Sequence, residues 1–84
     1  MKKDEIIATL GQNISKNILN QLENKIQPQE ALISSGLIDS FSLVDLALIV
    51  EENFNVRIED YELNVETFDS LDQLAELILA KKDS

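Results

Sequence analysis

The chain has 84 residues, with 16 acidic and 7 basic side chains and a formal net charge of −9 at pH 7. It contains no cysteine and no histidine, which excludes disulfides and thiolate metal sites and removes the commonest general base. We therefore expect one small domain, residues 1–84, that is not an enzyme and holds no metal ion.

The first predicted element is an amphipathic helix. From about Asp4 to Glu23 the apolar side chains recur at steps of three and four residues. Gly11 lies inside this run and costs about 1 kcal/mol relative to alanine. The buried face would consist of Ile7, Leu10, Ile14, Ile18 and Leu22.

The next segment, residues 24–39, has no sustained period and is predicted to be a long loop. Pro28 and the turn cluster Ser34–Gly36 oppose a helix there, apart from a brief helical turn around Gln29–Ile33. A connection of this length is unusual in a compact domain unless it is functional or packs by its own side chains. The apolar residues that would anchor it are Ile26, Leu32, Ile33, Leu37 and Ile38.

A second helix is predicted to start at Asp39 or Ser40, both good N-cap residues, and to run to about Asn53. Asn55 would end it in the left-handed conformation. The middle of this helix is apolar almost all round, so part of its surface must face a partner, a ligand or a loosely packed neighbour. On a helical wheel the core side is Leu43, Val44, Ala47, Val50 and Phe54, and a stripe on roughly the other side is Phe41, Asp45, Leu48 and Glu52.

The remaining residues predict a short extended link at Val56–Ile58, a brief helical turn at Asp60–Leu63 and a final helix. Ser70 and Gln73 fit a capping box at the start of this helix. Its buried face would be Leu71, Leu74, Ala75, Ile78 and Leu79. The sequence thus predicts an all-α fold with three long helices, one short helix and a long loop between the first and second helices.

Ser40 is the residue that stands out for function. A hydroxyl at the positive end of a helix lies where an attached or approaching anion is favoured. By itself this residue is explained as a simple cap, but a long loop containing Gly36 precedes it and an unusually apolar helix follows it. Because the chain has no histidine that could activate the hydroxyl, we expect Ser40 to be a residue that another enzyme modifies and not a catalytic nucleophile.

Charge placement narrows the class of partner. Arg57 is the only cation between Ile26 and Ala80, an interval rich in aspartate and glutamate. Such a surface repels nucleic acid and anionic membranes and attracts basic protein surfaces. No apolar run approaches the ~20 residues that span a bilayer, and no secretory signal follows Lys2 and Lys3, so we expect a cytoplasmic protein.

Four stretches together form a pattern typical of one protein family: Leu32–Phe41, Leu43–Leu46, Glu51–Val56 with Ile58, and Phe68–Leu71. At these positions the chain resembles the acyl carrier protein and peptidyl carrier protein family, and the resemblance extends from about Glu5 to Leu79. It implies a four-helix bundle in which Ser40 receives 4′-phosphopantetheine from coenzyme A through a separate Mg²⁺-dependent phosphopantetheinyl transferase. The thiol of that arm then carries an acyl or aminoacyl group as a thioester.

The resemblance also implies recognition residues and partners. Asp39 would help to position the transferase and its metal, and the partner-facing surface would be Phe41, Asp45, Leu48 and Glu52. Implied partners are the transferase, an acyl- or aminoacyl-loading ligase, and downstream acyl-processing or transfer enzymes with basic docking surfaces, in fatty acid, polyketide or related biosynthesis. The carrier would be a monomer.

The nature of the cargo stays open at the level of sequence. Ser42 is neutral where fatty-acid-synthesis carriers commonly have an acidic residue, and Asn55 stands where they usually have glycine. Leu37-Ile38 before Asp39 is closer to free-standing carriers such as the D-alanyl carrier protein, or to aminoacyl and peptidyl carriers. Two interpretations of other classes are an unmodified acidic helical adaptor for a basic protein, with Ser40 only a cap, and a cation-binding helical protein.

Overall fold

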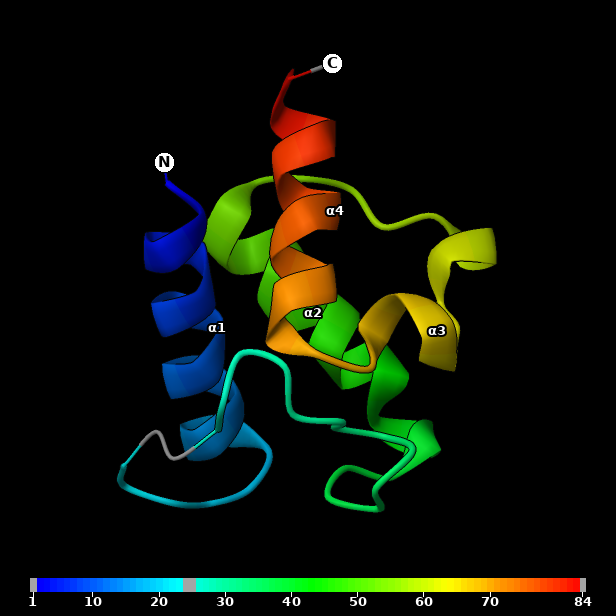
Figure 1. Ribbon diagram of the computed structural model, residues 1–84. Coiled ribbons are helices and arrows are strands. Elements are labelled where there is room, and N and C mark those ends of the chain that lie inside the picture. The colour runs from blue at the N-terminus through cyan, green and yellow to red at the C-terminus, as the bar shows by residue number, and fades with distance from the viewer. Residues whose placement is uncertain (1, 24–25, 84) are drawn as a thin grey trace.

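The computed structural model describes residues 2–23 and 26–83, and within these ranges the regular structure is entirely helical. The predicted all-α class is therefore confirmed. Figure 1 shows α1, α2 and α4 as the body of a bundle, with the short α3 at its side. The elements in order are α1 (Lys3–Asn17), η1 (Ser40–Ser42), α2 (Leu43–Phe54), η2 (Asp60–Glu62), α3 (Val65–Phe68) and α4 (Leu71–Asp83), where η denotes a 3-10 turn.

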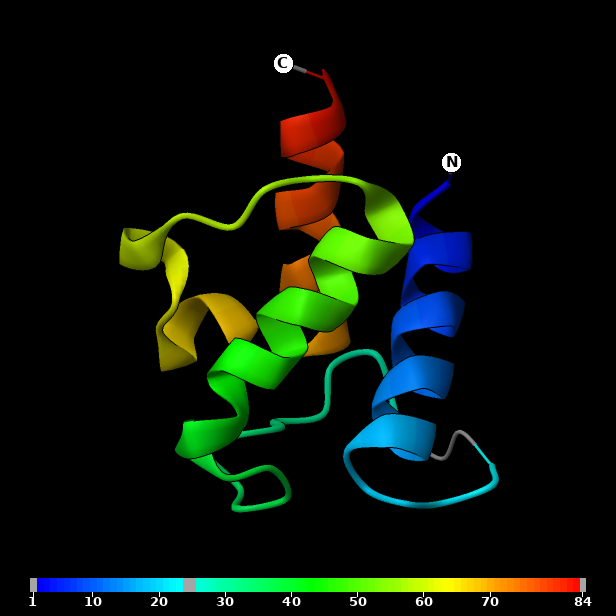
Figure 2. The same cartoon turned by 180° about the vertical axis from the view of Figure 1, so that it is seen from behind.

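The two chain ends lie at one end of the bundle, and the turn that contains Ser40 lies at the other. Both views agree on this: α1 runs away from the end that holds the termini, while α2 and α4 run back toward it (Figures 1 and 2). Within the described ranges no helix is long and apolar enough to cross a membrane.

Helix α1 is shorter than the sequence predicts. It ends at Asn17, and the carbonyl of Ile14 accepts hydrogen bonds from the backbone of both Ile18 and Leu19. Asn20 then adopts a left-handed conformation with φ 57°, which turns the chain away from the helix axis. Leu22, predicted on the buried face, is instead 94% exposed. The apolar period continues beyond Asn17, but the turn removes the later residues from the core.

The 3-10 turn η1 directly precedes helix α2. The helix ends, as predicted, at a left-handed Asn55, whose N–H donates to the carbonyl of Glu51. Its predicted core side is wrong at Val44, which is 58% exposed, because Leu46 and Ile49 face the core instead. A helix that is apolar almost all round has no single preferred side in its sequence. Packing against both α1 and α3 decides which side is buried.

The segment between α2 and α4 is organised by local caps. The extended link after Asn55 and the predicted turn are both present, and the N–H of Ile58 donates to the Glu51 carboxylate at 2.9 Å. Helix α3 was not predicted, although Asn64 accepts from the N–H of Thr67 at 2.8 Å in an ordinary N-cap arrangement. The sequence signal for α3 is Asn64, an N-cap residue type that stands three positions before Thr67.

Helix α4 begins where the sequence predicts. The N–H of Gln73 donates to the hydroxyl of Ser70 at 3.1 Å, which is the Ser70 half of the expected capping box. The predicted face of α4 is buried, with Leu79 half-buried. The fully buried centre of the molecule is formed by Ile6, Leu10, Ile14, Leu32, Leu46, Val50, Phe54, Phe68, Leu71, Leu74, Ala75 and Ile78.

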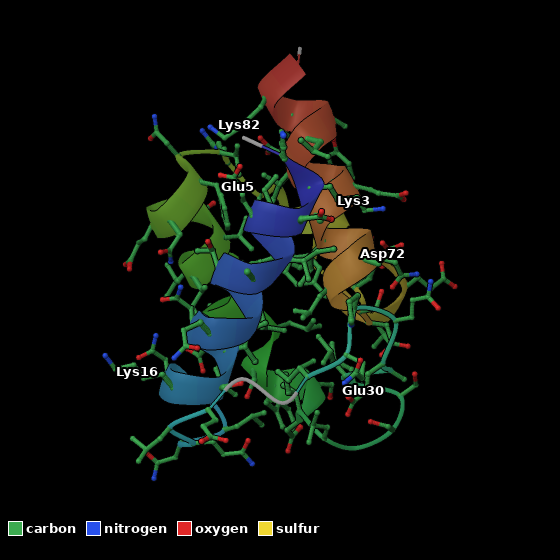
Figure 3. The ribbon with its side chains drawn as sticks, turned by 60° about the vertical axis from the view of Figure 1, so that its left-hand side comes forward. Lys3, Glu5, Lys16, Glu30, Asp72 and Lys82 are labelled. Atoms are coloured by element: carbon green, nitrogen blue, oxygen red, sulfur yellow. The ribbon has the colours of Figure 1, made fainter. Side chains whose placement is uncertain are left out.

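Ion pairs join the segments of the bundle. Lys3 on α1 contacts Asp72 on α4 at 2.7 Å (Figure 3). Lys3 also contacts Glu76 of α4 at 3.3 Å. Lys81 on α4 contacts Glu62 of η2 at 2.7 Å. Burial alone would raise the pKa of Glu62, but the Lys81 ammonium and the backbone N–H of Glu59 lower it below its usual value. The pair fixes η2 against α4.

Ser15 is a buried polar residue whose hydroxyl has no hydrogen-bond partner among the described residues. An unpaired buried hydroxyl is destabilising, and alanine also favours the helix slightly. We expect Ser15→Ala to raise the free energy of unfolding by about 1–2 kcal/mol, measured by urea denaturation. The matched control is Ala8→Ser at an exposed position of α1, which reports the helix-propensity difference alone. A loss of stability in Ser15→Ala would contradict this account.

Candidate functional site

Ser40 is exposed and is the first residue of the turn η1. The carboxylate of Asp39 caps this turn by accepting a hydrogen bond from the N–H of Phe41 at 3.1 Å. The carbonyl of Asp39 accepts from the N–H of Ser42 at 2.9 Å. The Ser40 hydroxyl is thereby presented at the surface on a closed and capped turn.

The geometry differs in one respect from the sequence prediction. The α-helix proper begins at Leu43, so one 3-10 turn separates Ser40 from the first turn of α2. Short 3-10 turns are frequent at helix N-termini because their tighter hydrogen bonds use backbone groups that the helix leaves unpaired. Asp39, and not Ser40, is the capping residue, which leaves the hydroxyl of Ser40 out of that cap.

The long loop before Ser40 is fastened to the start of α4 by one residue, Asp69. Its Oδ1 accepts hydrogen bonds from the backbone of Ile33 at 2.8 Å and of Ser34 at 2.9 Å. Its Oδ2 accepts from the hydroxyl of Ser34, and its carbonyl accepts from the N–H of Leu32 at 2.6 Å. We call Asp69 with Leu32, Ile33 and Ser34 the Asp69 clamp.

The clamp changes the acidity of its carboxyl group. The Ser34 hydroxyl and N–H, followed by the backbone of Ile33 and Leu32, hold the pKa of Asp69 below its usual value, while partial burial acts in the opposite direction. Hydrogen bonds to the ionised form favour that form. The clamp is therefore strongest when Asp69 is charged.

The loop also folds on itself between the clamp and the turn. The N–H of Gly36 donates to the carbonyl of Ile33 at 3.0 Å, and the N–H of Ile38 donates to the carbonyl of Leu32 at 2.8 Å. Gly36 has φ 85°, a conformation that side chains disfavour. Ile26, Leu32, Ile33 and Ile38 are buried as predicted, whereas Leu37 is exposed. The predicted helical turn at Gln29–Ile33 is absent, and this part of the loop has only a turn at Pro28 and Gln29 followed by bends.

The four residues that were predicted to form a stripe beside Ser40 are all exposed. Phe41 is 89% exposed and Leu48 is 49% exposed, so the stripe presents a large apolar area. Val44 lies between them on the same side of the helix, although the helical wheel predicts it on the core side. We define the docking stripe as Phe41, Val44, Asp45, Leu48 and Glu52.

Asp69 is the other residue that the sequence analysis did not assign to the site. The only signal was its position directly before the capping residue Ser70, where it entered as part of a family pattern. Its partners lie 35 and 36 positions earlier in the chain, and no local pattern marks such a pairing. Among the described residues no group of three or more acidic side chains is arranged to hold a metal ion.

A surface serine on a capped turn, with no histidine in the chain, fits a protein that accepts a group from an enzyme. The comparisons with known proteins identify the group. Residues 12–78 match the family described as "Phosphopantetheine attachment site". The chain is 31% identical over 77 residues to an acyl carrier protein of Acidothermus cellulolyticus, covering 89% of this chain and 90% of that protein.

A solved structure extends the likeness to the fold. The crystal structure of an acyl carrier protein from Thermotoga maritima superposes with a TM-score of 0.76 at 23% identity, covering 99% of this chain and 93% of that one. The chain belongs to the phosphopantetheine-binding acyl carrier family. It is a carrier and not an enzyme, it holds 4′-phosphopantetheine covalently, and it interacts with a phosphopantetheinyl transferase and with acyl-processing enzymes.

The lowered pKa of Asp69 predicts a pH dependence of stability. An unfolded aspartate titrates near ~3.9, and the folded pKa is lower, so the stabilisation is fully present above that value. It is lost as the pH falls through the folded pKa. We expect Asp69→Asn to lower the free energy of unfolding at pH 7 by about 1–3 kcal/mol, and the difference from the wild type to shrink below pH ~4.

Urea denaturation between neutral and acidic pH measures this difference. Glu52→Gln, which removes a charge from an exposed residue of the last turn of α2, is the matched control and should change stability little at any pH. A difference between wild type and Asp69→Asn that stays constant down to strongly acidic pH would contradict the charge-dependent clamp.

Proposed function

We propose that Ser40 is the residue that carries the 4′-phosphopantetheine arm. The observation that supports this most strongly is an exposed hydroxyl on a turn capped by Asp39, inside the residues that match the attachment family. In the transfer, a bond forms between Ser40 Oγ and phosphorus while the pyrophosphate bond of coenzyme A breaks. Adenosine 3′,5′-bisphosphate leaves, and the serine proton passes to a base of the transferase.

The arm supplies a thiol to a chain that contains no cysteine. We propose that this thiol holds an acyl group as a thioester and that the arm keeps it at high local concentration near each enzyme that docks. A D-alanyl or other aminoacyl cargo is the alternative, which the neutral Ser42 and the Leu37-Ile38 pair favour. With either cargo, acyl or aminoacyl, the chain works as a single carrier domain.

Partners of the carrier would recognise it through the docking stripe. Three of its five side chains are apolar and exposed, and the two carboxylates lie along one edge of them. An apolar contact area gives affinity by exclusion of water, while charges at its rim mainly steer the encounter and set its orientation. A partner with an apolar surface bordered by lysine or arginine fits this arrangement.

Modification of the purified apo-protein tests the attachment site. On incubation with coenzyme A, Mg²⁺ and a promiscuous phosphopantetheinyl transferase, we expect one arm to be added, as measured by intact mass. Ser40→Ala should abolish the addition because the accepting oxygen is gone. Ser42→Ala, which removes a hydroxyl from the same turn, should still be modified. An unchanged wild-type mass would favour the unmodified acidic adaptor.

Salt dependence separates the two parts of the docking stripe. We expect the double variant Asp45→Asn/Glu52→Gln to lower kcat/KM of the transferase several-fold at low salt and to approach wild type at high salt, because rim charges are screened. Leu48→Ala should lower kcat/KM at every salt concentration. Glu23→Gln/Glu66→Gln, which removes the same charge from exposed residues outside the stripe, is the control. Equal effects of the stripe and control double variants would contradict the assignment.

A further inference from the structure

We infer that Asp69, the residue at the C-terminal end of α3, is a positioning residue for the modification of Ser40. This inference rests on the proposed function, in which a transferase esterifies the hydroxyl of Ser40. Asp69 acts through the loop that precedes the serine, because its carboxylate holds residues 33 and 34 and so determines where the following turn begins.

The segment between the clamp and the serine has little packing of its own. Residues 34–37 and 39–40 are exposed, and the buried side chain among residues 34–40 is Ile38, with 2% of its surface exposed. A segment with so few buried contacts opens easily unless hydrogen bonds hold it. The Ser40 turn therefore depends on the hydrogen bonds that reach it from the clamp.

These hydrogen bonds form a continuous path. The clamp fixes Leu32 and Ile33, and the carbonyl of Leu32 accepts from the N–H of Ile38 at 2.8 Å. The next residue is Asp39, which caps the turn that starts with Ser40. The peptide group between Leu32 and Ile33 contains both this carbonyl and the N–H that the Asp69 carboxylate holds, so a rotation of this peptide would also move the carbonyl that holds Ile38.

The second anchor of the loop does not replace the clamp. The carbonyl of Pro28 accepts from the N–H of Asp72 at 2.9 Å, which fastens the earlier part of the loop to α4. This contact lies before Leu32 in the chain, so it does not hold residues 33 and 34. The backbone bond from Leu32 to the Asp69 carbonyl survives a side-chain substitution. The bonds from Ile33 and Ser34 both end on Asp69 Oδ1, an oxygen that asparagine keeps and alanine lacks, so Asp69→Ala is the variant that removes them.

The expected kinetic effect follows from the geometry of transfer. A reacting hydroxyl that is misplaced by about 1 Å is a poor nucleophile. If only a fraction of the molecules presents Ser40 correctly, the apparent affinity falls in proportion to that fraction while the bound, correctly placed molecules react at the normal rate. Loss of the clamp should therefore raise KM for the carrier and leave kcat nearly unchanged.

The experiment measures kcat and KM of a promiscuous transferase for apo wild type, Asp69→Ala and Ser34→Ala, well below each melting temperature. We expect Asp69→Ala, which removes the accepting oxygens, to raise KM for the carrier by about fivefold or more with kcat within about twofold. Ser34→Ala, which removes one donor to the same carboxylate, should give a smaller rise. Hydrogen exchange of the Ile33 and Ser34 amides should accelerate in Asp69→Ala.

Ala75→Gly is the matched control, because it weakens the interior of α4 without touching any group of the clamp. It should leave KM unchanged even where its stability equals that of Asp69→Ala. The inference is overturned if KM is the same in Asp69→Ala and in Ala75→Gly, or if the amides of Ile33 and Ser34 keep their protection in Asp69→Ala.

Failure of this inference is distinct from failure of the proposed function. If Ser40 is not the attachment residue, wild type and Ser40→Ala behave alike and no variant of the clamp needs to be assayed. If Ser40 is modified in the wild type and Asp69→Ala shows wild-type kinetics, only the positioning role is lost.

Discussion

The carboxylate of Asp69 joins the loop before Ser40 to the start of α4, two segments that lie 36 positions apart in the chain, and the proposed presentation of Ser40 depends on this contact. Asp69 lies between α3 and α4, and α4 is packed in the core. Its carboxylate accepts hydrogen bonds from a loop that has few buried side chains near Ser40. Because the donors are backbone N–H groups and one hydroxyl, the ionised carboxylate is the acceptor that suits them. Through this carboxylate the packed helices hold the exposed segment that leads to Ser40.

The separation of the buried core from the exposed docking stripe suits a carrier protein. The core is formed by apolar residues of α1, α2, α3 and α4, by Ile58 and by the loop residues Ile26, Leu32, Ile33 and Ile38, and it includes no residue of the docking stripe. Surface residues on α2 are therefore available for contacts with successive enzymes, and their apolar character costs the folded state little. In the proposed role these contacts would have to be transient, because successive enzymes share one carrier.

Much of the fold was predictable from local pattern. The family pattern around Ser40, the Ser70 cap of α4 and the left-handed Asn55 at the end of α2 are short-range signals, and the structure contains each element they predict. The end of α1 was not predictable because the apolar period continues past Asn17 as far as Leu22. The core side of α2 was misplaced at Val44, since a helix that is apolar all round depends on its neighbours for its orientation.

Asp69 illustrates the limit of sequence reasoning more sharply than any helix boundary. Its hydrogen-bond partners are distant in the chain, and its own neighbours in the sequence predict only the start of a helix.

The central claim is that Ser40 bears the arm, and peptide mapping of the protein purified from its own cells tests this claim most directly. The account predicts 4′-phosphopantetheine on the peptide that contains Ser40. A bare Ser40 in protein whose pathway is fully active, or an arm found on Ser34, Ser35 or Ser42, would contradict it.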